Sequence, residues 1–377
     1  MNIDIVSIDG MALAAEAWRL SRDFDKSIEW EDIYTVDGPV NEFPSAVCHF
    51  RDFTILEREI FASNRTHVMW ARTSFVDAPD KYTVPKDLLI HVDPLIHRSM
   101  RVMMEKGKAA GEHQDRWRRY LPVSAETSFS YRISYRDAVK FAQYFDHLQL
   151  CCSKSLVNRF AAIEEELKCL VDKFTGSRER TKKAVNMMRQ SRFLHEGEIT
   201  TERMARNGEM YKVPSMSDTG SIVVATFEVP FWIRAHFVRH RPVTVADDLF
   251  SLLQSDNVLN LSINHPIKMQ VAASINIWQQ LLGSRSCWLT QSTLGDEMDP
   301  WQAIVEMFLQ NGQGVLPCSG GTCPHHRDAR NRLEGTDPGV PCPRYMNLNS
   351  IDKTPWMEKL EHAAKSRGDF WLKELAA

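Results

Sequence analysis

The stretch Phe227–Phe250, FEVPFWIRAHFVRHRPVTVADDLF, decides how the rest of the chain is interpreted. A β-branched run reaches Pro230, and the apolar residues after it are spaced unevenly between cationic ones, as on a helix that buries one face. The pattern predicts a strand that ends at the proline and a helix that follows it. The helix ends in the cationic triplet Arg239-His240-Arg241.

The triplet has two physical interpretations. Two forked guanidiniums and an imidazole at one helix end suit a phosphate or another polyanion. Alternatively, the triplet is a solvated basic helix end, because most charge clusters face water and cations complement the helix dipole there. On charge alone the solvated helix end is the favoured interpretation, with the polyanion site as the alternative.

Strand, proline, mixed helix and Arg-His-Arg together resemble the signature of the flavin-dependent thymidylate synthases. The resemblance implies that the triplet holds FAD and that a serine and an arginine further along hold deoxyuridylate. Leu249 and Ser251 occupy those two positions here. The resemblance therefore implies a flavin site, with the nucleotide site elsewhere in the chain or a changed chemistry.

Length and composition exclude several classes of protein. The chain has 377 residues, which is enough for two cores, and 43% of them are hydrophobic and 25% charged. A net charge of -3 makes a nucleic-acid partner an unfavoured expectation. No apolar run approaches the roughly 18 residues of a membrane span, so no membrane partner is expected. Without a signal peptide or a disulfide framework, the chain is expected to be cytoplasmic.

The first quarter of the chain has the same order of alternating apolar residues, mixed helix and cationic cluster. If Arg65 is laid against Arg239, Ser74 comes close to the position of the missing serine. Ser74 and the nearby Arg72 are therefore candidate substrate-binding residues. His236, on the predicted helix before the triplet, is a further candidate.

The block after residue 112 resembles the second half of the same family. The resemblance makes Arg118 a nucleotide-binding arginine and Arg136 a flavin-binding one, while Ser134 and Phe145 stand where the family has asparagine and a second arginine. From the residues alone, Arg118 is an ordinary exposed arginine. Arg136 is less expected near a helix start, because the helix dipole there favours anions.

Two segments share the pattern Leu-Pro-x-Ser-x-x-Thr, LPVSAET from Leu121 and LPCSGGT from Leu316. They predict an internal duplication with a long period. Between them, the run Ile267–Leu289 is predicted to be a helix with Trp278 and Leu282 facing inward.

The expected fold class is α+β, with two thymidylate synthase-like modules in tandem, each an antiparallel sheet with packed helices. The predicted domains are an N-terminal extension at 1–45, a first module at 46–176, a second module at 177–335 and a helical tail at 336–377.

A Cys/His-rich segment follows the second Leu-Pro pattern. Its weak candidate zinc ligands are Cys318, Cys323, His325 and Cys342, with His326 alongside. The spacing is loose and lacks a Cys-x-x-Cys pair. We therefore expect that the chain has no metal site.

The predicted function is flavin-dependent transfer of a one-carbon unit to C5 of a pyrimidine deoxynucleotide, by methylation or hydroxymethylation. The resemblance implies FAD as cofactor, with methylene-tetrahydrofolate and NADPH as co-substrates. It also implies a homodimer of two-module chains that imitates a tetramer of modules. The alternative is a non-catalytic, synthase-derived structural or nucleotide-binding protein, and a weaker third hypothesis is a zinc-stabilised interaction module.

Overall fold

The structure is a computed structural model in which two compact units are distinguished. It describes residues 1–21, 28–36, 39–63, 69–71, 82–111, 117–188, 210–213, 222–239, 243–285 and 299–310. The first unit comprises Met1–Ala110, Trp117–Arg203 and Asp247–His265, and the second comprises Gly111–Arg116, Met204–Ala246 and Pro266–Ala377. The first unit thus continues past the predicted boundary at 176 and includes a segment from later in the chain.

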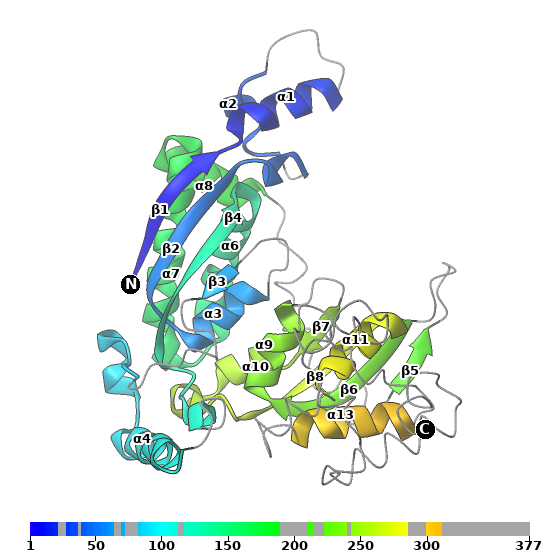
Figure 1. Ribbon diagram of the computed structural model, residues 1–377. Helices are drawn as coiled ribbons and strands as arrows, with labels where there is room; N and C mark the ends of the chain where they lie inside the picture. Colours follow the sequence, from blue (N-terminus) through cyan, green and yellow to red (C-terminus); the bar gives the residue numbers. More distant parts are fainter. Residues whose placement is uncertain are drawn as a thin grey trace, which may run out of the picture. The chain divides into compact units, whose positions relative to one another are not determined.

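The first unit is built on a four-stranded sheet with the order β1-β2-β4-β3 (Figure 1). The strands are β1 (Asn2–Asp9), β2 (Ser45–Thr54), β4 (Glu126–Ser134) and β3 (Met69–Ala71), and all their pairings are antiparallel. Strand β1 is an edge strand, so the predicted N-terminal extension contributes directly to the sheet of the first module.

Helices cover one face of this sheet (Figure 1). They are α3 (Ile55–Ala62), α6 (Tyr135–Cys151), α7 (Lys154–Thr175) and α8 (Arg178–Met187). The side chains between sheet and helices are mainly aromatic and fully buried, among them Phe50, Phe61, Phe129, Phe141 and Phe145. Neighbouring rings pack stacked, tilted or edge-on, and these rings form the core of the unit.

Helix α7 shows how the sequence determines an element. Ser153 accepts a hydrogen bond from the amide of Ser155 at the start, and Gly176 ends the helix in the left-handed conformation, with φ of 76°. The predicted apolar face is confirmed, because the following side chains are all buried: Leu156, Phe160, Ile163, Leu167 and Leu170.

Shorter elements complete the first unit. At its N-terminal end are α1 (Met11–Ser21), α2 (Trp30–Ile33) and η1 (Pro39–Glu42); η2 (Lys86–His91), α4 (Pro94–Ala109) and η3 (Arg118–Tyr120) precede β4. The later segment supplies α10 (Leu249–Gln254) and η5 (Val258–Asn260).

The second unit has a four-stranded sheet with the order β5-β6-β8-β7. Its strands are β5 (Met210–Val213), β6 (Ile222–Pro230), β8 (Pro266–Ser274) and β7 (Thr244–Asp247), and its helices are α9 (Phe231–Arg239), α11 (Ile275–Arg285) and α13 (Asp299–Gln310). Its core is also aromatic, with Phe227, Phe237, Trp278, Trp301 and Phe308 in contact.

The two sheets are repeats of one plan. Each places its second and fourth strands in chain order side by side, and a helix begins directly after each of the two equivalent strands β2 and β6. In the register, Thr54 pairs with Glu126 in the first sheet and Pro230 pairs with Pro266 in the second. The predicted α+β class, with antiparallel sheets and packed helices in both halves, is confirmed.

The register also corrects the alignment of the repeat. Strand β8 occupies the place of β4, and their first residues, 126 and 266, are 140 positions apart. Leu121 therefore corresponds to Leu261, whereas Leu316 lies outside the described residues. The prediction of one helix over Ile267–Leu289 is wrong in its first part, which forms β8. Trp278 and Leu282, on α11, are buried as predicted.

Candidate functional site

The strand, proline and helix predicted before the triplet are confirmed. Strand β6 ends at Pro230, and α9 runs from Phe231 to Arg239. Phe231, Ile233 and Phe237 are fully buried, so the apolar residues anchor this helix in its unit. The side chains of His236 and Arg239, and all of His240 and Arg241, lie outside the described residues.

The same register also aligns β2 with β6, whose ends precede the two helices. Thr54 and Pro230, the last residues of β2 and β6, are 176 positions apart. The same offset pairs Arg58 with Arg234, and both arginines are 1% exposed. The helices after β2 and β6 therefore share a buried arginine at the same position.

The same offset changes the expected partner of Arg65. It pairs Phe61 with Phe237 and places Arg65 opposite Arg241, not opposite Arg239 as predicted. Ser63 and Asn64 then stand at the first two positions of the triplet. By sequence position, the first copy retains only the last arginine of the triplet.

The position that the family fills with a serine is a core position in this chain. Leu249 is 1% exposed and is the first residue of α10. Its amide donates a hydrogen bond to Oδ1 of Asp247 at 3.1 Å. A buried leucine offers no donor to a nucleotide, so this segment stabilises the first unit instead. Arg72 and Ser74 lie outside the described residues.

Arg118 and Arg136 lie beyond opposite ends of β4. Arg118 belongs to η3, before the strand, and Arg136 belongs to α6, after it. The nine residues of β4 span about 30 Å at roughly 3.3 Å per residue. Within the first unit, the two arginines therefore do not meet at one ligand.

Arg136 is already paired. Its Nη1 lies 2.6 Å from Oε1 of Glu42, and both side chains are partly exposed. The nearby helix start is capped by Ser134, which accepts a hydrogen bond from the amide of Asp137. The carboxylate of Glu42 accounts for a cation at this helix start. The expected role of Arg136 in flavin binding stays a prediction, in which a flavin phosphate would compete with Glu42 for the same guanidinium.

Arg118 differs from an ordinary surface arginine. Its side chain is only 7% exposed, although the residues alone predict an exposed one. The offset of 140 that aligns β4 with β8 places Val258 at its position in the second copy, and Val258 is buried. The first half of the repeat thus has a buried cation where the second half has a buried valine.

The residues after η3 pair with the equivalent residues after η5, all within the first unit. The amide of Val123 donates to the carbonyl of Leu261, and the amide of Ile263 donates to the carbonyl of Leu121, both at 2.8 Å. Because 121 corresponds to 261 and 123 to 263, the two bonds are reciprocal. The pairing has the local two-fold character of an isologous contact between identical copies.

A hydrogen bond from His97 connects α4 to η5. Its Nε2 lies 3.2 Å from the carbonyl oxygen of Leu259, which also accepts a bond from Oγ of Ser124 at 2.6 Å. A carbonyl can only accept, so Nε2 carries the hydrogen. Tyr82 donates its hydroxyl hydrogen to the carbonyl of His97 at 2.9 Å. These bonds satisfy polar groups that the packing of η5 buries.

Burial is the main cause of a lowered pKa at His97. The bond to Leu259 and the carboxylate of Asp93 oppose the shift, and the guanidinium of Arg101 adds to it. The neutral side chain of His97 donates a hydrogen bond to the carbonyl of Leu259, so the role of His97 in this structure is to stabilise the packing of η5.

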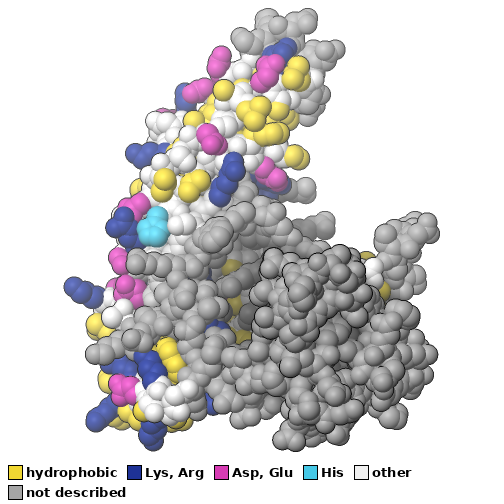
Figure 2. Space-filling view, in the orientation of Figure 1, with side chains coloured by type: hydrophobic (Ala, Val, Ile, Leu, Met, Phe, Trp, Pro, Cys, Tyr) yellow, Lys and Arg dark blue, Asp and Glu magenta, His cyan; other side chains and the backbone are white. Residues whose placement is uncertain are grey.

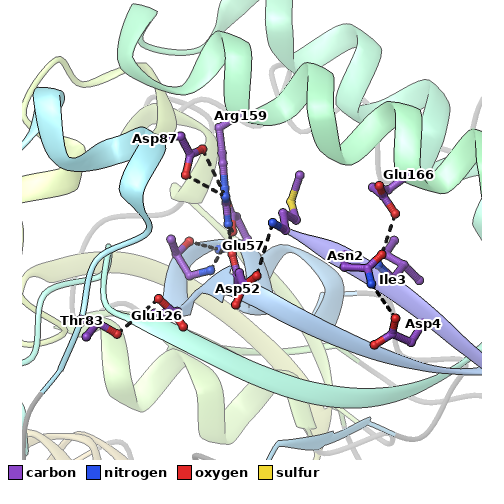
Figure 3. Close-up of polar contacts among 12 residues, drawn as sticks. Asn2, Ile3, Asp4, Asp52, Glu57, Thr83, Asp87, Glu126, Arg159 and Glu166 are labelled. Atoms are coloured by element: carbon purple, nitrogen blue, oxygen red, sulfur yellow. Dashed lines mark hydrogen bonds and ion pairs between the residues drawn. The ribbon is translucent and has the colours of Figure 1, made fainter.

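The sequence did not predict the buried ion-pair cluster of the first unit (Figure 3). Arg159, from α7, donates to Glu57 through Nε at 2.7 Å and to both oxygens of Asp87 through Nη1 at 3.2 Å. It also donates to the carbonyl of Asp52, whose φ of 59° is left-handed. The cluster joins the end of β2, the start of α3 and η2 to one helix.

This cluster is a structural site. Burial lowers the pKa of Arg159, but Glu57 and Asp87 outweigh it, and the net pKa is raised. Glu57 is also occupied by the amide of Thr54, which donates to its Oε2 at 2.7 Å. The Thr54 to Glu57 capping box was the only local sign in the sequence, since the other partners come from distant segments.

No metal site was found in the described part of the chain, where no group of three or more metal-binding side chains occurs. The candidate ligands Cys318, Cys323, His325 and Cys342 lie outside it. Among the described helices, none is both long enough and apolar enough to cross a bilayer.

Comparison with known proteins gives a distant likeness in fold. No family model and no curated protein matches the chain. Among solved structures, the chain is similar to a Helicobacter pylori flavin-dependent thymidylate synthase, ThyX, complexed with FAD and dUMP, with 11% identity and a TM-score of 0.35 over 50% of this chain and 100% of that one. A second structure of ThyX from Helicobacter pylori with FAD and dUMP gives 10% identity and a TM-score of 0.33 over 46% of this chain and 96% of that one.

Proposed function

We propose that this chain is a flavin-dependent enzyme that transfers a one-carbon unit to C5 of a pyrimidine deoxynucleotide, as a methyl or hydroxymethyl group. The observation that carries the proposal is the local structure around the triplet. A buried strand ends at Pro230, and an anchored helix follows it and ends at Arg239, the first residue of the triplet, which supports the proposal.

The two copies retain complementary cations, and this supports the proposal. The second copy has Arg239-His240-Arg241 but places Val258 where the first copy has Arg118. The first copy has the buried Arg118 but places Ser63 and Asn64 at the first two triplet positions. We infer that the second copy anchors the flavin and that the first anchors the nucleotide phosphate.

In this proposal the chain holds its ligands through charge. Bound FAD would supply hydride chemistry, with methylene-tetrahydrofolate as the one-carbon donor and NADPH as the reductant. The triplet would neutralise phosphate through charge-assisted hydrogen bonds. Arg118 would act from a buried position, where the attraction of a cation for a phosphate is stronger than in water. A cytoplasmic homodimer remains part of the same proposal.

The alternative is a non-catalytic protein that keeps the fold and has lost the ligands. Two observations favour it: Leu249 is a core residue where the motif has a serine, and Arg136 is paired with Glu42. In this case the triplet would be a solvated helix end.

The ligand content of the purified full-length protein separates the two functions. The enzyme is expected to carry flavin, seen as flavin absorbance and released on denaturation. Arg239→Ala and Arg241→Ala are each expected to weaken FAD binding by about 1.5 to 3 kcal/mol, the loss of a charge-assisted contact.

Arg19→Ala is the matched control, because Arg19 pairs with Glu16 on the partly exposed helix α1. It is expected to leave FAD binding unchanged. A wild-type protein that neither carries flavin nor binds added FAD supports the non-catalytic alternative.

A further inference from the structure

Helix α4 buries little of its surface in the first unit. Of its 16 residues, the buried ones are His97, Met104 and Gly107. They lie on one side of the helix. Met104 is seven residues, or about two turns, after His97, and Gly107 is ten residues, or nearly three turns, after it. This inner side connects the helix to the rest of the unit through the bond from His97 to Leu259.

The opposite side of α4 is exposed and carries apolar side chains between cationic ones. Leu95 and Val102, one heptad apart, share this side, and Met103 lies next to Val102. Leu89 and Ile90 are exposed on η2, which precedes α4 in the chain. We call these five exposed apolar residues the α4 patch, and their exposed fractions are 52% for Leu89, 84% for Ile90, 73% for Leu95, 40% for Val102 and 40% for Met103. Helix α4 packs on the first unit through its inner side, so packing within the unit does not account for the exposed apolar residues on its outer side.

Cations flank the α4 patch. Arg98 and Lys106 are exposed and lie on either side of the line from Leu95 to Val102, at helical spacings of three and four residues. Arg101 and Lys108 add charge, whereas the helix has one acid, Glu105. Figure 2 shows hydrophobic and Lys or Arg side chains side by side at the lower left of the described surface.

The nearby acids do not cancel this charge. Asp87 is held by Arg159, and Asp93 caps the start of α4 by accepting from the amide of Leu95 at 2.8 Å. The helix is therefore locally basic, although the whole chain has a net charge of -3.

We propose that the α4 patch docks on an anionic lipid surface. Its apolar side chains project from a convex helix, which suits insertion at the boundary between headgroups and acyl chains. The flanking arginine and lysine would then face the anionic headgroups. The composition of the chain did not predict this, because a few residues of one helix form the whole surface.

Charge distinguishes this occupant from three others. A second copy of α4 would bring like charges together. The C-terminal segment of this chain, 354–377, has four acidic and four basic residues, so it has no net charge to complement the helix. A nucleic acid would pair with the cations but would leave Leu95 and Ile90 in water.

Co-sedimentation of the full-length protein with vesicles tests the proposal. Binding is expected to vesicles of phosphatidylcholine with phosphatidylserine, not to phosphatidylcholine alone, and is expected to weaken as salt rises. Arg98→Gln and Lys106→Gln should each weaken binding roughly fivefold, which corresponds to about 1 kcal/mol per cation near an anionic surface. The double variant Ile90→Ser and Leu95→Ser should weaken it further.

Leu150→Ser is the matched control, since Leu150 is 83% exposed at the end of α6 and outside the patch. It should bind vesicles like the wild type, and circular dichroism checks that every variant is folded. The proposal is overturned by absent binding, by equal binding to both vesicles, or by an Ile90→Ser and Leu95→Ser variant that binds like Leu150→Ser. Preferential binding to a DNA duplex or to polyglutamate, with the vesicles left unbound, also overturns it. None of these residues belongs to the proposed flavin site, so this test is independent of FAD binding.

Discussion

The two sheets have the same strand order, but the equivalent helices that follow β2 and β6 differ in the residues they carry. Helices α3 and α9 both have a fully buried arginine, Arg58 or Arg234, and a buried phenylalanine one turn later. Arg58 pairs with its neighbour Glu59, and the residue after Arg234 is Ala235. The shared positions are those that fix the helix on its sheet. The residues that follow in the sequence, Ser63-Asn64-Arg65 and Arg239-His240-Arg241, differ in charge.

Replacing the shared phenylalanine in each copy tests the alignment. Phe61 lies among the rings of the first core, and Phe237 contacts Phe227, Trp278 and Trp301. Phe61→Ala and Phe237→Ala are each expected to lower the free energy of unfolding by about 3 to 5 kcal/mol, since each leaves a cavity in a packed core. Urea denaturation measures both losses. A negligible loss in either variant would contradict the equivalence of these two positions.

The ion-pair cluster around Arg159 lies in the first unit and allows a second test. Arg159→Ala leaves the carboxylate of Glu57 buried without its guanidinium, so a loss of about 3 to 5 kcal/mol is expected. Arg178→Ala, at a partly exposed ion pair of α8, should cost under about 1 kcal/mol. Equal losses in urea denaturation would show that burial of the cluster contributes nothing.

Much of this comparison was accessible from the sequence. The change from β-branched residues to a mixed helix at Pro230 predicted β6 and α9, because proline and the change of period both mark that boundary. Strand β8 was missed although Ile267, Met269 and Val271 are buried at alternate positions, because their pattern runs directly into that of α11.

Other features depend on long-range contacts that periodicity does not show. The shared Leu-Pro-x-Ser-x-x-Thr pattern led to Leu316, and only the pairing of strands shows that Leu261 is the counterpart of Leu121. Arg159 meets Glu57 and Asp87 from separate elements, so no local pattern could reveal the cluster. The triplet was recognised because its three residues are contiguous.

A serine precedes the helix that follows β4 and the helix that follows β8, which allows a smaller test. Ser134 accepts from the amide of Asp137 at 3.1 Å, and Ser274 accepts from the amide of Ile277 at 3.5 Å. Ser134→Ala should cost about 1 kcal/mol of unfolding free energy, and Ser274→Ala less because its bond is longer. A larger loss for Ser274→Ala in thermal or urea unfolding would contradict this ranking.

Protonation of His97 gives the smallest expected effect, and it concerns the first unit alone. Its pKa in the folded protein is below the ordinary 6.5, chiefly through burial. Above pH 6.5 the side chain is neutral in both states, and its contribution to stability is complete. Below it, the unfolded chain binds the proton more readily, so stability falls as pH falls towards the folded pKa.

His97→Gln should reduce this pH dependence, because glutamine still donates to Leu259 but does not titrate. Urea midpoints of both proteins on each side of pH 6.5 measure it. An identical pH dependence in the variant would contradict the assignment.

The division of cations between the copies is tested most directly by titration calorimetry of the Arg118→Ala and Arg241→Ala variants with FAD and with deoxyuridylate, deoxycytidylate serving as the alternative pyrimidine. Arg118→Ala is predicted to bind FAD like the wild type but to bind its nucleotide at least tenfold more weakly, from a lost contact of about 1.5 to 3 kcal/mol. Arg241→Ala is predicted to lose FAD affinity by a similar factor. Loss of FAD affinity in Arg118→Ala, or unchanged affinities in both variants, would contradict the division.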